Sequence, residues 1–199
     1  MATAVISASE AMHYTHALWA GLPVIPATIG LLAFFMGLTI IGIGESSKVA
    51  IIIFITHLVS LTILVLAGGL YLVTHGLEVL QFNGRIPTEG GVVMALIFGF
   101  SAAMLGISGF ESSANFVEEQ KPGVFPKTLR NMWLVVSIFN PLTAFLALAI
   151  IPIPEIAQHQ EALLSHMGGI SGGNWLRWVI SVDAALVLSG AVLTSFVGV

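Results

Sequence analysis

The chain has 199 residues, of which 57% are hydrophobic and only 8% charged, and its mean hydropathy is +1.01. Soluble domains carry about 25% charged residues, so a water-soluble fold would lack the polar side chains to cover its surface, and the lipid bilayer is the expected solvent. The net charge of −4, with six lysines and arginines in total, excludes the basic footprint that nucleic-acid binding requires.

The first part of the chain predicts two membrane spans after an extramembrane segment. Residues 1–21 mix polar and apolar side chains and are expected to lie outside the membrane. Residues 22–44 are apolar throughout, and about 20 such residues suffice to cross a bilayer. A polar turn at 45–48 separates this span from the second one, at 49–73.

The third predicted span, residues 91–117, follows a loop at 74–90 and is interrupted at about 106–111. Glycines there disfavour helix, serine hydroxyls compete for backbone groups, and a carboxylate is expensive at this depth. Freed backbone groups persist in a membrane only against protein or a polar cavity, so the pattern predicts a discontinuous helix beside a small polar site. The alternative is a continuous helix with small residues packed at its interface. The candidate substrate-binding residues are Ile107, Ser108, Gly109, Phe110 and Glu111.

Two further spans are predicted at 131–151 and 175–199, which makes five in all and an all-α membrane protein. Pro141 predicts a kink in the fourth span, because proline removes a backbone hydrogen bond and clashes with the preceding turn. Asp183 in the fifth span is costly in lipid unless it is paired or hydrated, so it is expected to line a vestibule or to meet a cation.

The longest loop, residues 155–174, is expected to hold a short amphipathic helix at 155–167. The glycine pairs at 168–169 and 172–173 predict flexible joints. His159 and His166 have no convincing metal-ligand spacing, so we expect them to be solvated. No nucleophile elbow or cofactor-binding loop is found either, so neither enzymatic activity nor a cofactor is expected.

The distribution of basic residues predicts the orientation of the spans. Lys48, Lys121, Lys127 and Arg130 fall in the segments 45–48 and 118–130, whereas Arg85 and Arg177 fall on the opposite side. The loops 45–48 and 118–130 are therefore expected in the cytoplasm, with the N-terminus outside and the C-terminus inside. The apolar run at the end of the chain, and the lack of a second interrupted helix, predict that further helices of a larger transporter complete the bundle.

Two sequence motifs stand out at consistent spacing. The first is Gly109-Phe110-Glu111 with the downstream stretches 118–122 and 125–127, and the second is the turn at 42–49. Both resemble motifs of the amino acid–polyamine–organocation (APC) superfamily, where Phe125 stands in place of the usual Ile and the turn is similar to that between helices four and five of cationic-type permeases. The resemblance identifies the chain as about helices four to eight of a transporter with a 5+5 inverted-repeat fold.

The resemblance implies secondary active transport of amino acids or related organic cations, coupled to H⁺ or Na⁺, by an integral protein of the plasma or inner membrane. Substrate would bind at mid-membrane, where residues 107–111 contribute half of the site. Glu111 would act either as a proton or gating carboxylate or as a cap of the second half-helix. The alternatives are a cation–chloride cotransporter-like member of the same fold and a truncated, non-transporting membrane subunit.

Four residues are candidates for ion coupling. The resemblance places His57 where proton-coupled members commonly have a lysine, and histidine titrates near neutral pH. Ala191, Thr194 and Ser195 resemble the sodium site of sodium-coupled relatives, and oxygen ligands suit a hard cation. The alternatives are a histidine satisfied by a neighbouring polar group, and small-residue packing with the hydroxyls bonded back to their own helix.

Overall fold

The computed structural model describes residues 2–41, 47–87, 90–105 and 121–197, and the regular secondary structure in these ranges is helical throughout. The helices are α1 (Ala2–Leu18), α2 (Val24–Ile40), α3 (Ser47–His75), α4 (Glu78–Asn83), α5 (Gly91–Leu105), α7 (Val124–Ile150), α8 (Ile153–His159), the 3₁₀ turn η2 (Gln160–Ala162), α9 (Leu163–Gly172) and α10 (Asn174–Val197). The prediction of an all-α chain is confirmed.

Three of the described helices are long and apolar enough to cross a membrane: Lys48–His75, Val124–Ile150 and Asn174–Phe196. They correspond to the second, fourth and fifth predicted spans. The described parts of the first and third predicted spans form the shorter apolar helices α2 and α5. The expected interruption at 106–111 lies outside the described residues. Many apolar side chains on the outer helix faces are exposed, such as Leu70 on α3 and Phe98 on α5, as is typical of surfaces that meet lipid or further helices.

Helix α7 begins seven residues before the predicted span and runs through Pro141. Its start follows Gly123, whose φ of 80° is a conformation that glycine adopts without strain. The early start is compatible with Pro126, because a proline in the first turn removes an N–H that has no helical partner. Hydropathy predicts only the apolar part of this helix. The prediction therefore did not include its polar first turns.

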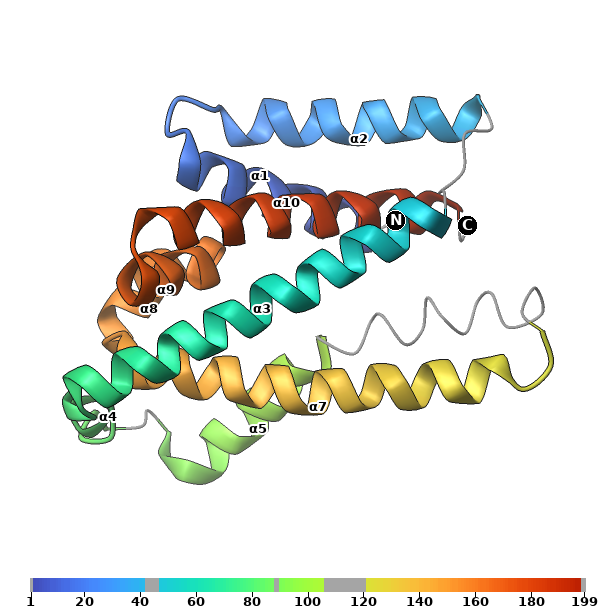
Figure 1. The fold of residues 1–199 in the computed structure, drawn as a ribbon. Helices are drawn as coiled ribbons and strands as arrows, with labels where there is room; N and C mark the ends of the chain where they lie inside the picture. Colours follow the sequence, from blue (N-terminus) through green and yellow to red (C-terminus); the bar gives the residue numbers. More distant parts are fainter. Residues whose placement is uncertain (1, 42–46, 88–89, 106–120, 198–199) are drawn as a thin grey trace.

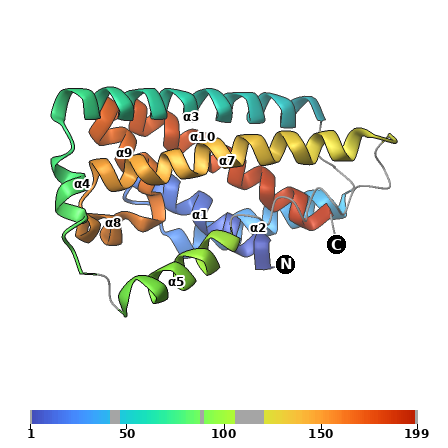
Figure 2. The ribbon, with the colours of Figure 1, turned by 90° about the horizontal axis from the view of Figure 1, so that it is seen from below.

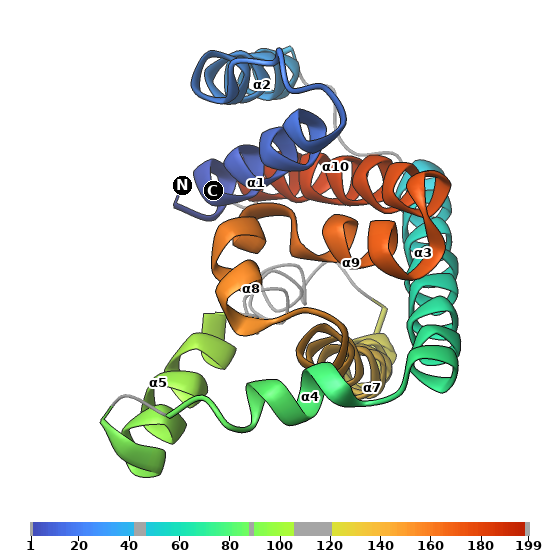
Figure 3. The ribbon, with the colours of Figure 1, turned by 90° about the vertical axis from the view of Figure 1, so that its left-hand side faces the viewer.

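The principal core lies where α3, α7, α9 and α10 meet, and its fully buried side chains include Leu64, Ile151, Met167 and Leu176. Figure 1 shows α3, α7 and α10 as the long elements of the fold, with α3 and α7 close at the ends where they finish and diverging towards their starts. Figure 2 shows the same helices from below. Figure 3, seen from the end where α3 and α7 finish, shows α4, α8 and α9 lying across that end. The short helices thus close one end of the bundle.

Helix α1 was not predicted as part of the bundle, but it packs along α10. Ala4 and Ala8 are buried against Val192, while at the other end of α1 the guanidinium of Arg177 donates a 2.5 Å hydrogen bond to the carbonyl of Ala17. The two helices therefore run antiparallel, and the start of α1 lies beside the end of α10 (Figure 2). Residues 2–18 therefore pack along a helix that is long enough to cross a membrane.

The loop at 155–174 is more helical than the glycine pairs indicated. Leu163, Leu164 and Ile156 face the principal core and Met167 is fully buried, as the amphipathic pattern predicted. Residues 168, 169 and 172, where the glycine pairs predict joints, belong to helix α9. The turn to α10 is made at Gly173, with φ of 81°.

We predict that Gly172→Ala destabilises the protein although alanine favours helix. A Cβ at residue 172 would lie 2.5 Å from Cδ2 and 2.9 Å from Cβ of Leu176, which is fully buried, so the core must shift. Overpacking of this kind costs about 1–3 kcal/mol. The matched control is Gly69→Ala, where no atom lies within 4 Å of the added Cβ and alanine gains about 0.5–1 kcal/mol of helix propensity. Unfolding in SDS should give shifts of opposite sign, and equal shifts would contradict this account.

Candidate functional site

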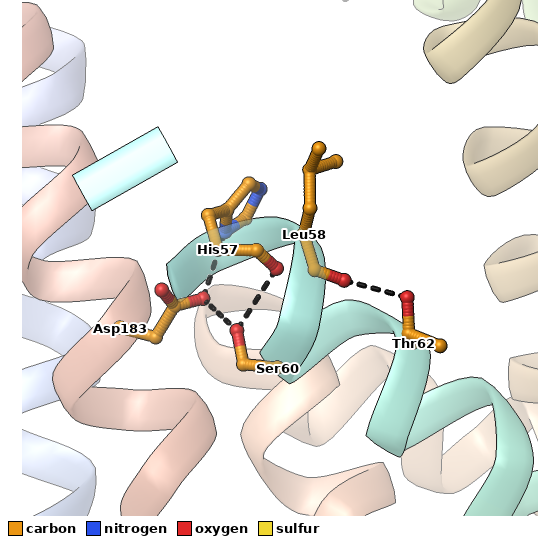
Figure 4. A network of polar contacts seen from close by, with 5 residues as sticks. All are labelled: His57, Leu58, Ser60, Thr62 and Asp183. Atoms are coloured by element: carbon orange, nitrogen blue, oxygen red, sulfur yellow. Dashed lines mark hydrogen bonds and ion pairs between the residues drawn. The ribbon is translucent and has the colours of Figure 1, made fainter. Parts of the chain in front are cut away.

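The most buried ionisable side chain among the described residues of the long helices, Asp183, contacts two polar side chains of α3. His57 and Ser60 are three residues apart on α3 and so share a face, while Asp183 faces them from α10 (Figure 4). Hydrophobic residues surround this group along both helices. The pairing explains how each span tolerates an ionisable residue, because each supplies the partner that the other needs.

The carboxylate of Asp183 makes two short contacts. Its Oδ2 lies 2.7 Å from Nδ1 of His57 and accepts a 2.5 Å hydrogen bond from the hydroxyl of Ser60. The Ser60 oxygen also lies 3.0 Å from the carbonyl of His57. Distances of this length are typical of hydrogen bonds that involve an ionised group. The Asp183 side chain is only 6% exposed, whereas that of His57 is 29% exposed.

The imidazole of His57 connects the buried carboxylate to two cavities. One cavity, of about 190 Å³, lies between α3 and α10 and is lined by His57, Phe54, Ala191 and Thr194 among others. The other, of about 500 Å³, lies between α3 and α7, where Asn131 and Asn140 contribute polar side chains to a mostly apolar lining. A proton or a small cation that entered either cavity would therefore meet His57 before it met Asp183.

The structure brings His57 together with two of the three predicted sodium-site residues, Ala191 and Thr194, in the smaller cavity. The hydroxyl of Thr194 donates a 3.0 Å hydrogen bond to the carbonyl of Gly190, and that of Ser195 donates a 2.7 Å bond to the carbonyl of Ala191. Both hydroxyls are thus bonded back to their own helix, which is the alternative that the sequence left open. The oxygen of a hydroxyl group that donates a hydrogen bond, such as that of Ser195, can also accept one or bind a hard cation.

Asp183, which the sequence placed either at a vestibule or beside a cation, is buried and paired with a histidine that lies 126 positions earlier in the chain. The candidate substrate residues 107–111 lie outside the described residues.

A second polar cluster, which the sequence did not indicate, joins α1 to η2. Nδ1 of His13 lies 2.7 Å from the carboxylate of Glu161. A cavity of about 590 Å³ there is lined in part by Glu10, His13, Tyr14 and Glu161. Burial, together with the nearby charge of Glu10, raises the pKa of Tyr14 to about 12, so its phenol stays protonated at physiological pH. This cluster lies near the surface, unlike the pair of His57 and Asp183.

Comparison with known proteins gives one result. The family model described as amino acid permease matches residues 1–199, which is the whole chain. No curated protein and no solved structure matches the chain.

Proposed function

Because the chain belongs to the amino acid permease family, we propose that the protein carries out secondary active transport of amino acids or related organic cations, coupled to H⁺ through His57 and Asp183. The family supports amino acid transport across a membrane, by a transporter and not an enzyme. The observation that carries the coupling part is the 2.7 Å contact between His57 and the buried carboxylate of Asp183.

The charge on this pair changes with proton binding. With a proton on the imidazole and an ionised carboxylate, the two charges cancel. After the proton leaves, one negative charge remains buried between two membrane helices, where an unpaired charge is costly. The protonated and deprotonated pair therefore favour different conformations of the transporter. This difference in free energy between conformations is what coupling to a proton gradient requires.

Sodium coupling is the second candidate. It is supported by the smaller cavity, where Thr194 and Ala191 line the same space as His57. A sodium ion there would take oxygen ligands from α10 and balance the charge of Asp183 from the cavity side. The two candidates differ in the role of the His57 imidazole. In proton coupling the imidazole binds the proton, whereas in sodium coupling it only positions the carboxylate of Asp183.

The substrate site is proposed at Ile107, Ser108, Gly109, Phe110 and Glu111. This part rests on the sequence alone, since half-helix ends carry partial charges of about half an electron that suit a zwitterionic amino acid. The remaining helices of the full-length transporter would complete the site.

Uptake of radiolabelled amino acids into proteoliposomes of the full-length protein tests the proposal. We expect at least one amino acid to accumulate under an inward proton gradient, and Gly109→Leu to reduce this uptake at least tenfold, because a bulky side chain would fill the substrate space. Glu111→Ala should reduce it strongly. A matched imposed sodium gradient distinguishes the two ions. Normal uptake in both variants at normal expression would contradict the proposed substrate site, and accumulation driven only by sodium would contradict proton coupling.

A further inference from the structure

The structure gathers two histidines and a glutamate where α8 meets α9. Glu155 and His159 are four residues apart on α8, so their side chains share a face. His166 on α9 faces them, with its Nε2 at 2.8 Å from the carboxylate of Glu155. The rings of His159 and His166 stack with centroids 4.0 Å apart. His159 is exposed, as expected of a solvated residue, but its ring lies against that of His166.

The ligand atoms of the three residues have the spacing of a metal site. One atom from each of Glu155, His159 and His166 can be chosen so that all lie within 4.8 Å of one another. A tetrahedral zinc ion with bonds of about 2.0–2.2 Å separates its ligands by about 3.4 Å. Because an imidazole nitrogen binds a metal in the plane of its ring, the two stacked rings would turn apart until their nitrogens point at one ion.

From this grouping we propose that Glu155, His159 and His166 form a binding site for Zn²⁺ or a similar borderline transition-metal ion. Two imidazoles and one carboxylate are a ligand set that zinc uses, and imidazole nitrogen disfavours the hard cations Ca²⁺ and Mg²⁺. His159 is exposed, so an ion can reach the site from water and complete its coordination with a water molecule.

The position of the site gives the metal a structural consequence. A bound ion would link α8 to α9, and α9 is anchored in the principal core through Met167, the neighbour of His166. The other neighbour of His166, Ser165, lies 2.6 Å from Ser181 on α10, and both are buried. Metal binding should therefore hold α8 against the part of the bundle that contains Asp183, and raise the unfolding temperature.

Isothermal titration of the purified full-length protein with ZnCl₂, after removal of any polyhistidine tag, tests the site. We expect one Zn²⁺ per chain with micromolar affinity and a rise in unfolding temperature at saturating metal. The variants His159→Ala and Glu155→Gln should each weaken binding at least tenfold. Binding of Co²⁺ should give the visible d–d bands of a four-coordinate ion.

The matched control is His75→Ala, because His75 is also exposed at the end of a helix and stacks on an aromatic ring, Tyr71. It should bind zinc as the unchanged protein does. Equal loss of affinity in His75→Ala and His159→Ala would overturn the proposal in favour of scattered surface binding. The absence of binding at Zn²⁺ concentrations up to about 100 μM would also overturn the proposal. Glu155 and His166 would then form an ion pair only.

Discussion

Replacing Asp183 by asparagine is expected to reduce proton-driven amino acid uptake at least tenfold while leaving the fold intact. Asparagine preserves the size of the side chain and an oxygen that can accept the hydrogen bond from Ser60, which lies 2.5 Å away. It lacks the negative charge that faces Nδ1 of His57, 2.7 Å from the carboxylate. In the variant, proton binding no longer switches the pair between a negative and a neutral state. The proton gradient should therefore no longer drive uptake.

The measurement compares two assays in proteoliposomes. Uptake under an inward proton gradient requires coupling, whereas exchange of labelled for unlabelled substrate without a gradient does not require net proton movement. Asp183→Asn should lose the first and retain the second. If instead gradient-driven uptake persists unchanged in Asp183→Asn, the pair does not couple transport to protons.

Two further variants make this result specific. His57→Ala should have a similar effect, and the double variant should be no worse than either single one, because residues that act as a unit give non-additive losses. Glu161→Gln is the matched control. Glu161 also lies 2.7 Å from a histidine, His13, but its side chain is 62% exposed. We expect this change to leave gradient-driven uptake within about twofold, since exposed ion pairs contribute little.

Replacing Asn83 by alanine is expected to cause the second large effect, a loss of about 3 kcal/mol in the free energy of unfolding, because buried groups would lose their partners. Asn83 at the end of α4 is only 6% exposed. Its amide nitrogen donates hydrogen bonds of 2.8 and 2.9 Å to the carbonyls of Leu148 and Ile151, and its oxygen accepts a 2.9 Å bond from the N–H of Ile153. One side chain thus satisfies both the end of α7 and the start of α8.

Unfolding in SDS, followed by tryptophan fluorescence, should measure this loss. Asn83→Asp is the informative second variant, since it can still accept from Ile153 but directs a carboxylate oxygen at two carbonyls, and should be at least as unstable as alanine. Asn140→Ala on α7 serves as the control, because Asn140 is exposed although it lines the larger cavity, and its expected change is within about 0.5 kcal/mol. Equal destabilisation by Asn83→Ala and Asn140→Ala would contradict the bonding role of Asn83.

Sequence alone predicted the long helices well, because α3, α7 and α10 are continuous apolar runs of sufficient length. It did not predict the role of α1, whose packing against α10 depends on small residues that fit closely and not on high hydropathy. The positions of Ala4, Ala8 and Ala11, spaced at about one turn and all buried, were the available signal.

The candidate site was predictable in its members but not in its arrangement. His57 and Asp183 both stood out as ionisable residues in apolar spans. Their contact spans 126 positions, and helical spacing says nothing about which helices become neighbours. The metal-ligand grouping was missed for a related reason. His159 and His166 are seven residues apart, but η2 lies between them and turns α9 back towards α8. The spacing of residues along one continuous helix therefore does not describe how the two histidines lie.

The large sequence separation of His57 and Asp183 also has a consequence for how the protein is made. Synthesis proceeds from the N-terminus, so α3 is complete well before α10 leaves the ribosome. His57 can enter the bilayer as an uncharged imidazole, which costs less than inserting a carboxylate. Asp183 is synthesised after His57, so its partner can already be in the membrane when the carboxylate enters it.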